Sequence, residues 1–184
     1  SRITITLVTT LADGSQHRRS GYVTEAQSLD SDGGLARKSL LVRPWIALLE
    51  HSMCSRVWQD KSVMDIVEDV FAGHDSIAAW RWDEDVAQHV ANGLHGPTGG
   101  VRKYCVQYRE SDGRFISRLL AEEGLNWRVE EDEAAPGGHT IVILANSLKQ
   151  AQDPTSGTLL GGKGMRFHRS SSQWSWFHAG GQKR

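Results

Sequence analysis

The 184-residue chain has few cysteines and no long apolar run. Its two cysteines are too few for a disulfide framework in a chain of this length, so we expect reduced thiols in a cytosolic protein. No uninterrupted apolar stretch approaches the roughly 20 residues that a membrane-spanning helix requires, which predicts no membrane span. The first residues, Ser1-Arg2-Ile3, begin no basic region followed by an apolar core, so no Sec-type signal peptide is expected.

The chain also lacks a strong net charge, since 21 basic and 22 acidic residues give −1. General nucleic-acid binders are strongly basic, so we predict no nucleic-acid partner. This neutrality conceals a division, because residues 147–184 carry six Lys or Arg and one acid, or +5. The preceding residues carry 15 basic and 21 acidic side chains, or −6. We therefore expect an acidic body followed by a basic, irregular C-terminal segment.

Signatures of common catalytic and metal sites are missing as well. No Gly-x-Ser-x-Gly, Cys-x-x-Cys, His-x-x-x-His or His-Glu-x-x-His occurs, and the eight histidines are scattered. Cys105 lies in a strand pattern, a poor position for an accessible thiolate. Residues 157–163 match the start of a phosphate-binding P-loop, but Gly164 stands where Ser or Thr would ligate magnesium. We predict no catalytic residues, no cofactor, no metal and no enzyme activity.

The first fifty residues show the alternation that is typical of β-strands. Apolar residues alternate with threonines over residues 3–7, and further extended segments are expected over residues 23–26 and 35–45. Pro44 ends the third segment, because proline is tolerated only at the edge or end of a strand. Three strands joined by polar turns predict a meander or part of a barrel.

Two later segments carry the apolar spacing of helices. Over residues 63–71 apolar side chains fall at i, i+3, i+4, i+7 and i+8, and Ser62 with Asp65 forms a candidate capping box. A second helix is expected from a cap at Asp112 to Gly124. Together with the strands, these two main helices predict an α+β fold.

The remaining segments complete this pattern. A weaker helix is expected over residues 85–92 and a strand over 101–109, with a β-hairpin over 125–144. Seven tryptophans are many for this length, and they suit either a core or an interface.

Five longer stretches carry more information than any short motif. They are SGYVTEA at 20–26, VRPWIALL at 42–49, WQDKSVMDIV at 58–67, YCVQYRESD at 104–112 and FISRLLAEEGL at 115–125, and SDGGLAR at 31–37 and His139-Thr140 with the apolar strand after it fit as well. In this order they resemble the N-terminal region of VgrG proteins, the spike-hub proteins of type VI secretion, which are related to phage tail hub proteins and to Rhs-element Vgr proteins. The resemblance covers roughly residues 1–173.

The resemblance implies a phage tail hub-like fold with incomplete β-barrel modules beside an α/β module. Residues 1–50 would form a partial first barrel, 51–124 the α/β module, 125–146 the start of a second barrel, and 147–184 the irregular segment. Full-length relatives are implied to form homotrimers that cap the Hcp tube, contact the baseplate and help to deliver effector proteins. Such proteins assemble in the cytoplasm and leave through the type VI apparatus.

The resemblance also identifies motif residues, which we expect to be structural rather than catalytic. Among them, Tyr104, Gln107 and Arg109 are expected at packing or hydrogen-bonding positions. The full set is Arg43, Pro44, Trp45, Gln59, Asp60, Lys61, Tyr104, Gln107, Tyr108, Arg109, Glu110, Asp112, Glu123 and Gly124.

The chain departs from the pattern at Gly113-Arg114, where relatives usually carry an apolar or acidic pair, and the match stops after Gln173. We therefore expect a fragment of a type VI spike hub with a structural function. One alternative is a free-standing α+β module for a small ligand or peptide, which a deep closed pocket lined by tryptophans would indicate. A weaker alternative is a nucleotide-handling enzyme that uses Lys163.

Overall fold

The computed structural model describes residues 3–10, 14–32, 35–93 and 100–150. The chain divides into two compact units, residues 1–147 and 148–184. The P-loop-like stretch with Lys163 and nearly all of the basic C-terminal segment lie outside the described residues. No helix within the described part is long and apolar enough to cross a membrane.

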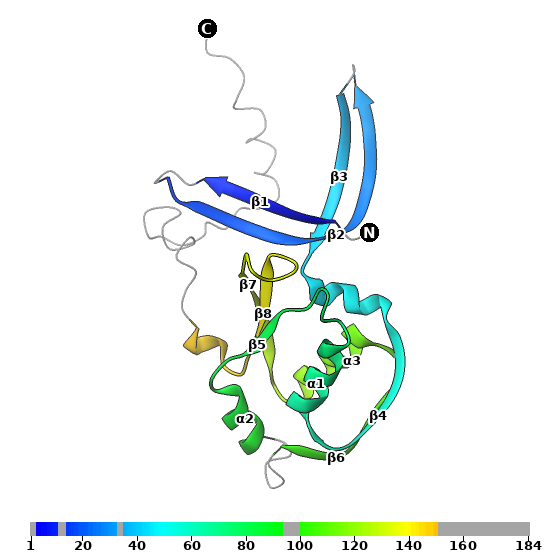
Figure 1. Cartoon of the computed structure of the whole chain (residues 1–184), viewed down its shortest axis with the longest axis vertical. Coiled ribbons are helices and arrows are strands. Elements are labelled where there is room, and N and C mark those ends of the chain that lie inside the picture. The colour runs from blue at the N-terminus through cyan, green and yellow to red at the C-terminus, as the bar shows by residue number, and fades with distance from the viewer. Residues whose placement is uncertain (1–2, 11–13, 33–34, 94–99, 151–184) are drawn as a thin grey trace, which may run out of the picture. The chain divides into compact units, whose positions relative to one another are not determined.

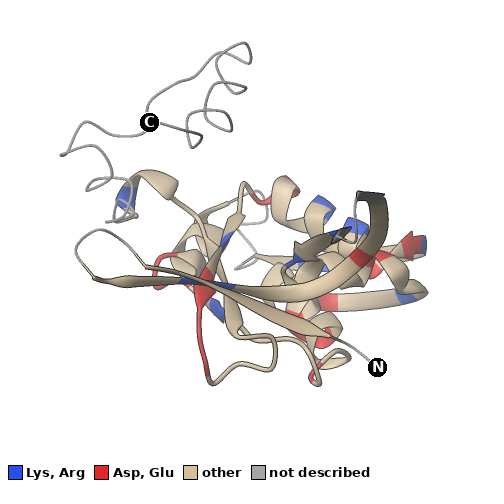
Figure 2. Ribbon diagram, turned by 90° about the horizontal axis from the view of Figure 1, so that it is seen from above, with Lys and Arg blue, Asp and Glu red and all other residues tan. Residues whose placement is uncertain are grey.

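The first unit begins with three strands, and short helices and strands then alternate before its last two strands (Figure 1). In chain order the elements are β1 (Thr4–Thr10), β2 (Gln16–Asp32), β3 (Leu35–Arg43), the 3₁₀ helix η1 (Trp45–His51), β4 (Met53–Ser62), α1 (Val63–Ala72), β5 (Trp80–Trp82), α2 (Val86–Asn92), β6 (Val101–Ser111), α3 (Asp112–Glu122), β7 (Asn126–Glu131) and β8 (His139–Leu144), followed by the 3₁₀ turn η3 (Ser147–Lys149). Acidic and basic positions are interspersed along these elements (Figure 2).

The described strands form three separate sheets, and none of them closes into a barrel. The orders are β1-β2-β3, β4-β6 and β5-β8-β7. All pairs are antiparallel except β5 with β8, which run parallel. This mixture of helices and sheets agrees with the α+β expectation, and the predicted β7–β8 hairpin is confirmed, whereas the incomplete barrels remain a prediction.

The N-terminal meander is confirmed, but its middle strand is longer than the sequence indicated. β2 has 17 residues and pairs with β1 through its first part and with β3 through its second. The register shifts between Val23 and Glu25, and β2 bends at this point (Figure 1). The prediction of a third strand reaching Trp45 is wrong, because Pro44 stops β3 at Arg43 and Trp45 begins η1.

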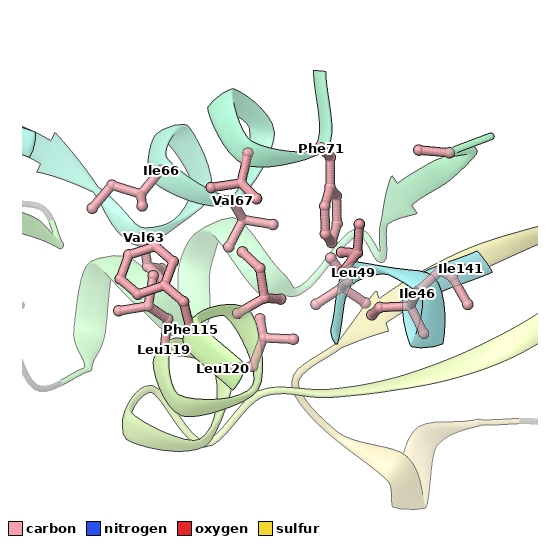
Figure 3. Packing of buried hydrophobic residues seen from close by; sticks show 14 of the residues in the cluster. Ile46, Leu49, Val63, Ile66, Val67, Phe71, Phe115, Leu119, Leu120 and Ile141 are labelled. Carbon is pink, nitrogen blue, oxygen red and sulfur yellow. The ribbon is translucent and has the colours of Figure 1, made fainter. Parts of the chain in front are cut away.

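The core of the first unit lies among α1, α3 and η1, with the β4–β6 pair around them (Figure 1). Trp58 stacks on Phe115 with ring centroids 5.0 Å apart, and Trp45 meets Phe71 edge-on at 4.9 Å. Figure 3 shows the neighbouring apolar side chains converging between the helices. Burial of each such side chain contributes about 1.5–3 kcal/mol, so this cluster is the main source of stability.

The helix caps follow the sequence in one case and correct it in the other. The capping box of α1 is confirmed, with Ser62 and Asp65 bonded reciprocally. The prediction of Asp112 as the cap of α3 is wrong, because the Ser111 hydroxyl accepts the backbone N–H of Arg114 at 3.3 Å. Ser111 has the extended backbone that a cap requires, whereas the Asp112 carboxylate is engaged in the interior.

Two strands were not anticipated from the sequence. β4 carries charged residues at Arg56, Asp60 and Lys61, which obscure its alternation. β5 has three residues, Trp80 to Trp82, too few to produce a periodic signal.

Candidate functional site

The motif residues concentrate on β6 and at the start of α3, where the strand has two unlike faces. Cys105 and Gln107 lie on a buried face, whereas Tyr104 and Tyr108 are 60% and 70% exposed. This division follows from the alternation of side chains along a strand. Tyr104, which was expected at a packing or hydrogen-bonding position, therefore points away from the core of the described chain.

Asp112 is the centre of the buried face. Its carboxylate is fully buried and accepts hydrogen bonds from Gln107 Nε2 at 2.8 Å and Arg56 Nη1 at 3.2 Å. His74 Nε2 lies 2.8 Å from the second carboxylate oxygen, and the Asp112 backbone N–H donates to the Ser52 carbonyl at 2.9 Å. A buried carboxylate with this many partners fixes β4, the end of α1, β6 and α3 in one arrangement.

A second buried ionic group fastens the end of α3 to the start of β6. Arg102 is 8% exposed and donates to Glu122 and Glu123, each at 2.6 Å. Burial by itself would raise the pKa of Glu122, but hydrogen bonds from Arg102 and Arg118 outweigh burial and lower that pKa. Gly124 then ends the helix with a φ of 69°, which glycine adopts without strain.

Trp45 links η1 to the β7–β8 hairpin. Its backbone N–H donates to Nε2 of the fully buried His139 at 2.9 Å, and its indole N–H donates to the Ala79 carbonyl at 3.0 Å. His139 Nδ1 lies 2.9 Å from the Gly137 carbonyl. Because Nε2 accepts, the ring proton resides on Nδ1 and is donated to Gly137. Pro44, which precedes Trp45, is the N-cap residue of η1.

The motif on β4 is more exposed. Asp60 has a φ of 50°, and its carboxylate accepts a hydrogen bond from Lys103 at 2.8 Å. Lys61 donates to Asp69 at 2.5 Å, and the same carboxylate accepts the Trp58 indole N–H at 3.1 Å. Arg43 at the end of β3 and Gln59 on β4 are exposed as well. The ion pairs of Asp60 and Lys61 tie β4 to β6 and to α1 at the surface.

Arg109 lies where β6 meets a surface cleft. Its φ is 47°, its backbone N–H donates to Ser55 Oγ at 3.1 Å, and its guanidinium lies 5.7 Å from the Tyr108 ring centre. Glu110, the next residue, pairs with Arg118 at 2.9 Å. The cleft has a volume of about 640 Å³ and is lined by Glu50, His51, Met53, Tyr108, Arg109, Glu110, Ser111 and Arg114. It contains no tryptophan, so it is not the tryptophan-lined pocket of the ligand-binding alternative.

The described side chains form no recognised catalytic group. Burial raises the pKa of the Cys105 thiol, which keeps it protonated and a poor nucleophile. Both cysteines are free. Within the described ranges, no three His, Cys, Asp or Glu side chains are grouped to hold a metal ion.

Sequence reasoning missed several partners of the motif residues, namely Arg56, His74 and Arg102, and although His139 fitted the family pattern, its bond to Trp45 was not foreseen. Most of these partners lie far along the chain from the motif residue that they bond, as His139 lies far from Trp45. No local sequence pattern therefore indicates the pairing. Arg56 is different, because it lies two residues before Trp58 and therefore on the same side of β4. A charged residue at an inward position of a strand was the available signal.

Comparison with known proteins assigns this fold to a family. Residues 2–175 match the family described as phage tail baseplate hub (GPD). The E. coli c3393 protein, described as a component of the type VI secretion system with structural similarity to the T4 bacteriophage tail proteins gp27 and gp5, superposes with a TM-score of 0.59 at 22% identity. The superposition covers 79% of this chain and 37% of that protein, and it shows the fold alone.

Curated relatives agree with this assignment. The Pseudomonas aeruginosa type VI secretion system spike protein VgrG1b is 26% identical over 144 residues, which are 78% of this chain and 17% of that protein. VgrG4b from the same organism is 33% identical over 124 residues, which are 67% of this chain and 14% of that protein. The chain thus spans less than a fifth of the length of these two relatives. It belongs to the phage tail baseplate hub family and is a VgrG-like relative of the type VI secretion spike proteins.

Proposed function

We propose that the chain is a structural, non-enzymatic part of a type VI secretion spike hub that forms a homotrimer and caps the Hcp tube. Baseplate and effector proteins are its further partners, and it assembles in the cytoplasm before export through the type VI apparatus. The family and the spike-protein relatives support this proposal. The proposal includes the domain assignments: a partial first barrel at 1–50, an α/β module at 51–124 and the start of a second barrel at 125–146.

The observation that carries the proposal is the open, apolar N-terminal sheet. Within the described residues, β1 and β3 each pair on one side only, so each leaves a row of backbone groups without a strand partner. Leu7 is 64% exposed on β1, Leu29 51% on β2 and Leu40 48% on β3. Exposed apolar strands with free edges are surfaces on which other chains pair, so this sheet suits assembly better than catalysis.

Mass measurement tests the proposal. The chain is run by size-exclusion chromatography with light scattering, over a range of concentrations and with purified Hcp from the same cell. We expect trimers at high concentration and co-elution with Hcp. A chain that stays monomeric and elutes apart from Hcp at every concentration contradicts the proposal.

A matched pair of variants locates the surface. Leu40→Lys places a charge on the exposed face of β3 and should reduce trimer formation by roughly tenfold or more. Leu148→Lys, at a residue that is 93% exposed in η3, makes the same change outside the three sheets and should leave association unchanged. Equal loss in both variants would indicate that added charge, rather than the β1–β3 sheet, controls association.

A further inference from the structure

The outer face of the β4–β6 pair is an uncovered strip of apolar and aromatic side chains. Tyr104 is 60% exposed, Tyr108 70% and Val57 55%, and Val57 is the cross-strand partner of Val106. No strand flanks β4 or β6 among the described elements. We define the aromatic strip as Met53, Val57, Tyr104, Val106 and Tyr108. Exposed tyrosines beside aliphatic side chains are typical of protein interfaces.

The aromatic strip runs into the cleft of about 640 Å³ described above, which we call the arginine cleft. Met53 and Tyr108 belong to both, so the two form one continuous surface. The remaining lining comes from the end of η1, the end of β6 and the first turn of α3. An extended segment lying along the strip therefore reaches the charged groups of the cleft at its end.

The arginine cleft is lined by two arginines and two glutamates, and among the described residues only one of these four groups, Glu110, is in an ion pair. Among the described residues, the guanidinium groups of Arg109 and Arg114 make no ion pair with a carboxylate. Glu110 pairs with Arg118, which also pairs with Glu122, so the charged lining groups without an ion-pair partner among the described residues are Arg109, Arg114 and Glu50. A guanidinium pairs well with a carboxylate. Two guanidinium groups beside one acid therefore favour an anionic ligand.

Arg109 points outward, although its place in the strand would direct its side chain inward. Strict alternation would place it on the buried face with Cys105 and Gln107, yet it is exposed. The register shift between Cys54 and Arg56 and the φ of 47° interrupt the alternation and turn the side chain outward. A left-handed residue other than glycine carries strain, which persists where the surrounding structure imposes it and is concentrated at functional positions.

From these observations we propose that the aromatic strip and the arginine cleft dock an extended peptide segment of a partner protein. Its apolar side chains lie on Tyr104, Val57 and Tyr108, and its carboxylates pair with Arg109 and Arg114. Because two arginines and one acid of the cleft lack an ion-pair partner within the described residues, an acidic segment is the complementary occupant. This docking function goes beyond the hub assembly proposed above and uses a different sheet.

A binding titration with the full 184-residue chain tests this proposal. The probes are a fluorescein-labelled peptide, Leu-Glu-Glu-Leu-Glu-Glu, and its counterpart with Gln in place of Glu, both followed by fluorescence anisotropy. Saturable binding of the Glu peptide is expected, with an affinity at least about tenfold above that of the Gln peptide, because the charge-assisted pairs require carboxylates.

The variants assign the binding to the cleft. Arg109→Asn with Arg114→Gln removes both charges, and asparagine tolerates the left-handed backbone at position 109. This double variant should weaken the Glu peptide by roughly tenfold or more. Arg37→Gln with Lys38→Gln removes equal charge from exposed positions on β3 and should leave affinity unchanged. Arg114→Gln alone, at an exposed position of α3, serves if the double variant does not fold, and should weaken binding several-fold.

Three results would overturn the proposal. The two peptides could bind alike, both charge-loss variants could weaken binding equally, or the chain could bind a second copy through the strip so that self-association excludes the peptide. The titration does not require trimers or Hcp. Its failure would leave the hub assembly standing, and failure of assembly would leave the docking result standing.

Discussion

The β1–β3 sheet exposes its apolar side chains, whereas the region built on α1, α3 and η1 buries them. Leu7 and Leu40 on the sheet are 64% and 48% exposed, whereas Leu49 and Leu119 are completely buried. The helical region therefore supplies its own hydrophobic stabilisation, and the sheet does so only to a small degree. One region is therefore stabilised by its own core, whereas the other leaves its apolar side chains at the surface.

The sheet is attached to the rest of the first unit near the bend of β2. Tyr22 is 4% exposed, and its ring meets that of His139 edge-on at 6.3 Å. The Ser20 backbone N–H donates to Glu131 at 3.1 Å. A Cβ at Gly137 would lie 2.6 Å from the Tyr22 ring, so glycine is required for this approach. Within the described residues, the sheet is attached near this bend. Beyond it, the strands are held mainly by their backbone hydrogen bonds to one another.

The largest effect on stability is expected at Trp45, which lies in the buried region. Trp45→Ala removes a fully buried ring and its hydrogen bond to Ala79, and should lower the free energy of unfolding by about 3–5 kcal/mol. Leu40→Ala on the exposed sheet should change it by less than about 0.5 kcal/mol. Urea unfolding followed by fluorescence measures both, and similar losses would mean that the sheet belongs to the same cooperative core.

The next effect concerns the buried carboxylate of Asp112. Asp112→Asn weakens its pairing with Arg56 and His74 in the interior and should cost about 2–3 kcal/mol. Asp60→Asn is the matched change at an exposed aspartate whose φ of 50° asparagine also tolerates. We expect that variant to unfold within about 0.5 kcal/mol of the parent chain in the same urea titration. If Asp112→Asn leaves the free energy of unfolding unchanged, the hydrogen-bond network around Asp112 is not needed for stability.

A smaller effect compares two left-handed glycines. Gly124→Ala, at a φ of 69° behind α3, should cost about 1–2 kcal/mol of global stability. Gly14→Ala, at a φ of 82° between β1 and β2, carries the same strain with open space around it. Hydrogen exchange should show its effect in the amides of β1 and β2 alone, because opening of this sheet is local. Uniform loss of protection in both variants would contradict that view.

The smallest effect is a pH dependence at the start of α1. Hydrogen bonds from the Ser62 hydroxyl and backbone N–H lower the pKa of Asp65 below its ordinary 3.8. A lowered folded-state pKa gives stability that is present above 3.8 and is lost as the pH falls through the folded-state value. Asp65→Asn should therefore differ from the parent chain at pH 7 and converge with it in acid. Thermal unfolding scans across this pH range measure the difference, and a gap between the two proteins that persists in acid would contradict the prediction.

The sequence was most informative where apolar spacing is local. The periodicity over residues 63–71 predicted α1, and Pro44 marked the end of β3. Charges at Arg56 and Asp60 obscured β4, because alternation is read from apolar residues. The surface could be predicted less well, since the exposure of Arg109 depends on its left-handed backbone and on a register shift in the facing strand.

The shared middle strand of the N-terminal sheet has a mechanical consequence. β2 is continuous, and its pairs with β1 and β3 overlap at Tyr22. Interstrand hydrogen bonds lie across the strands. A pull along β3 therefore loads its hydrogen bonds to β2 as shear, many at once rather than one by one, up to the bend of β2, beyond which β1 runs in another direction (Figure 1). A sheet that contributes little to the core can thus still resist tension along β3.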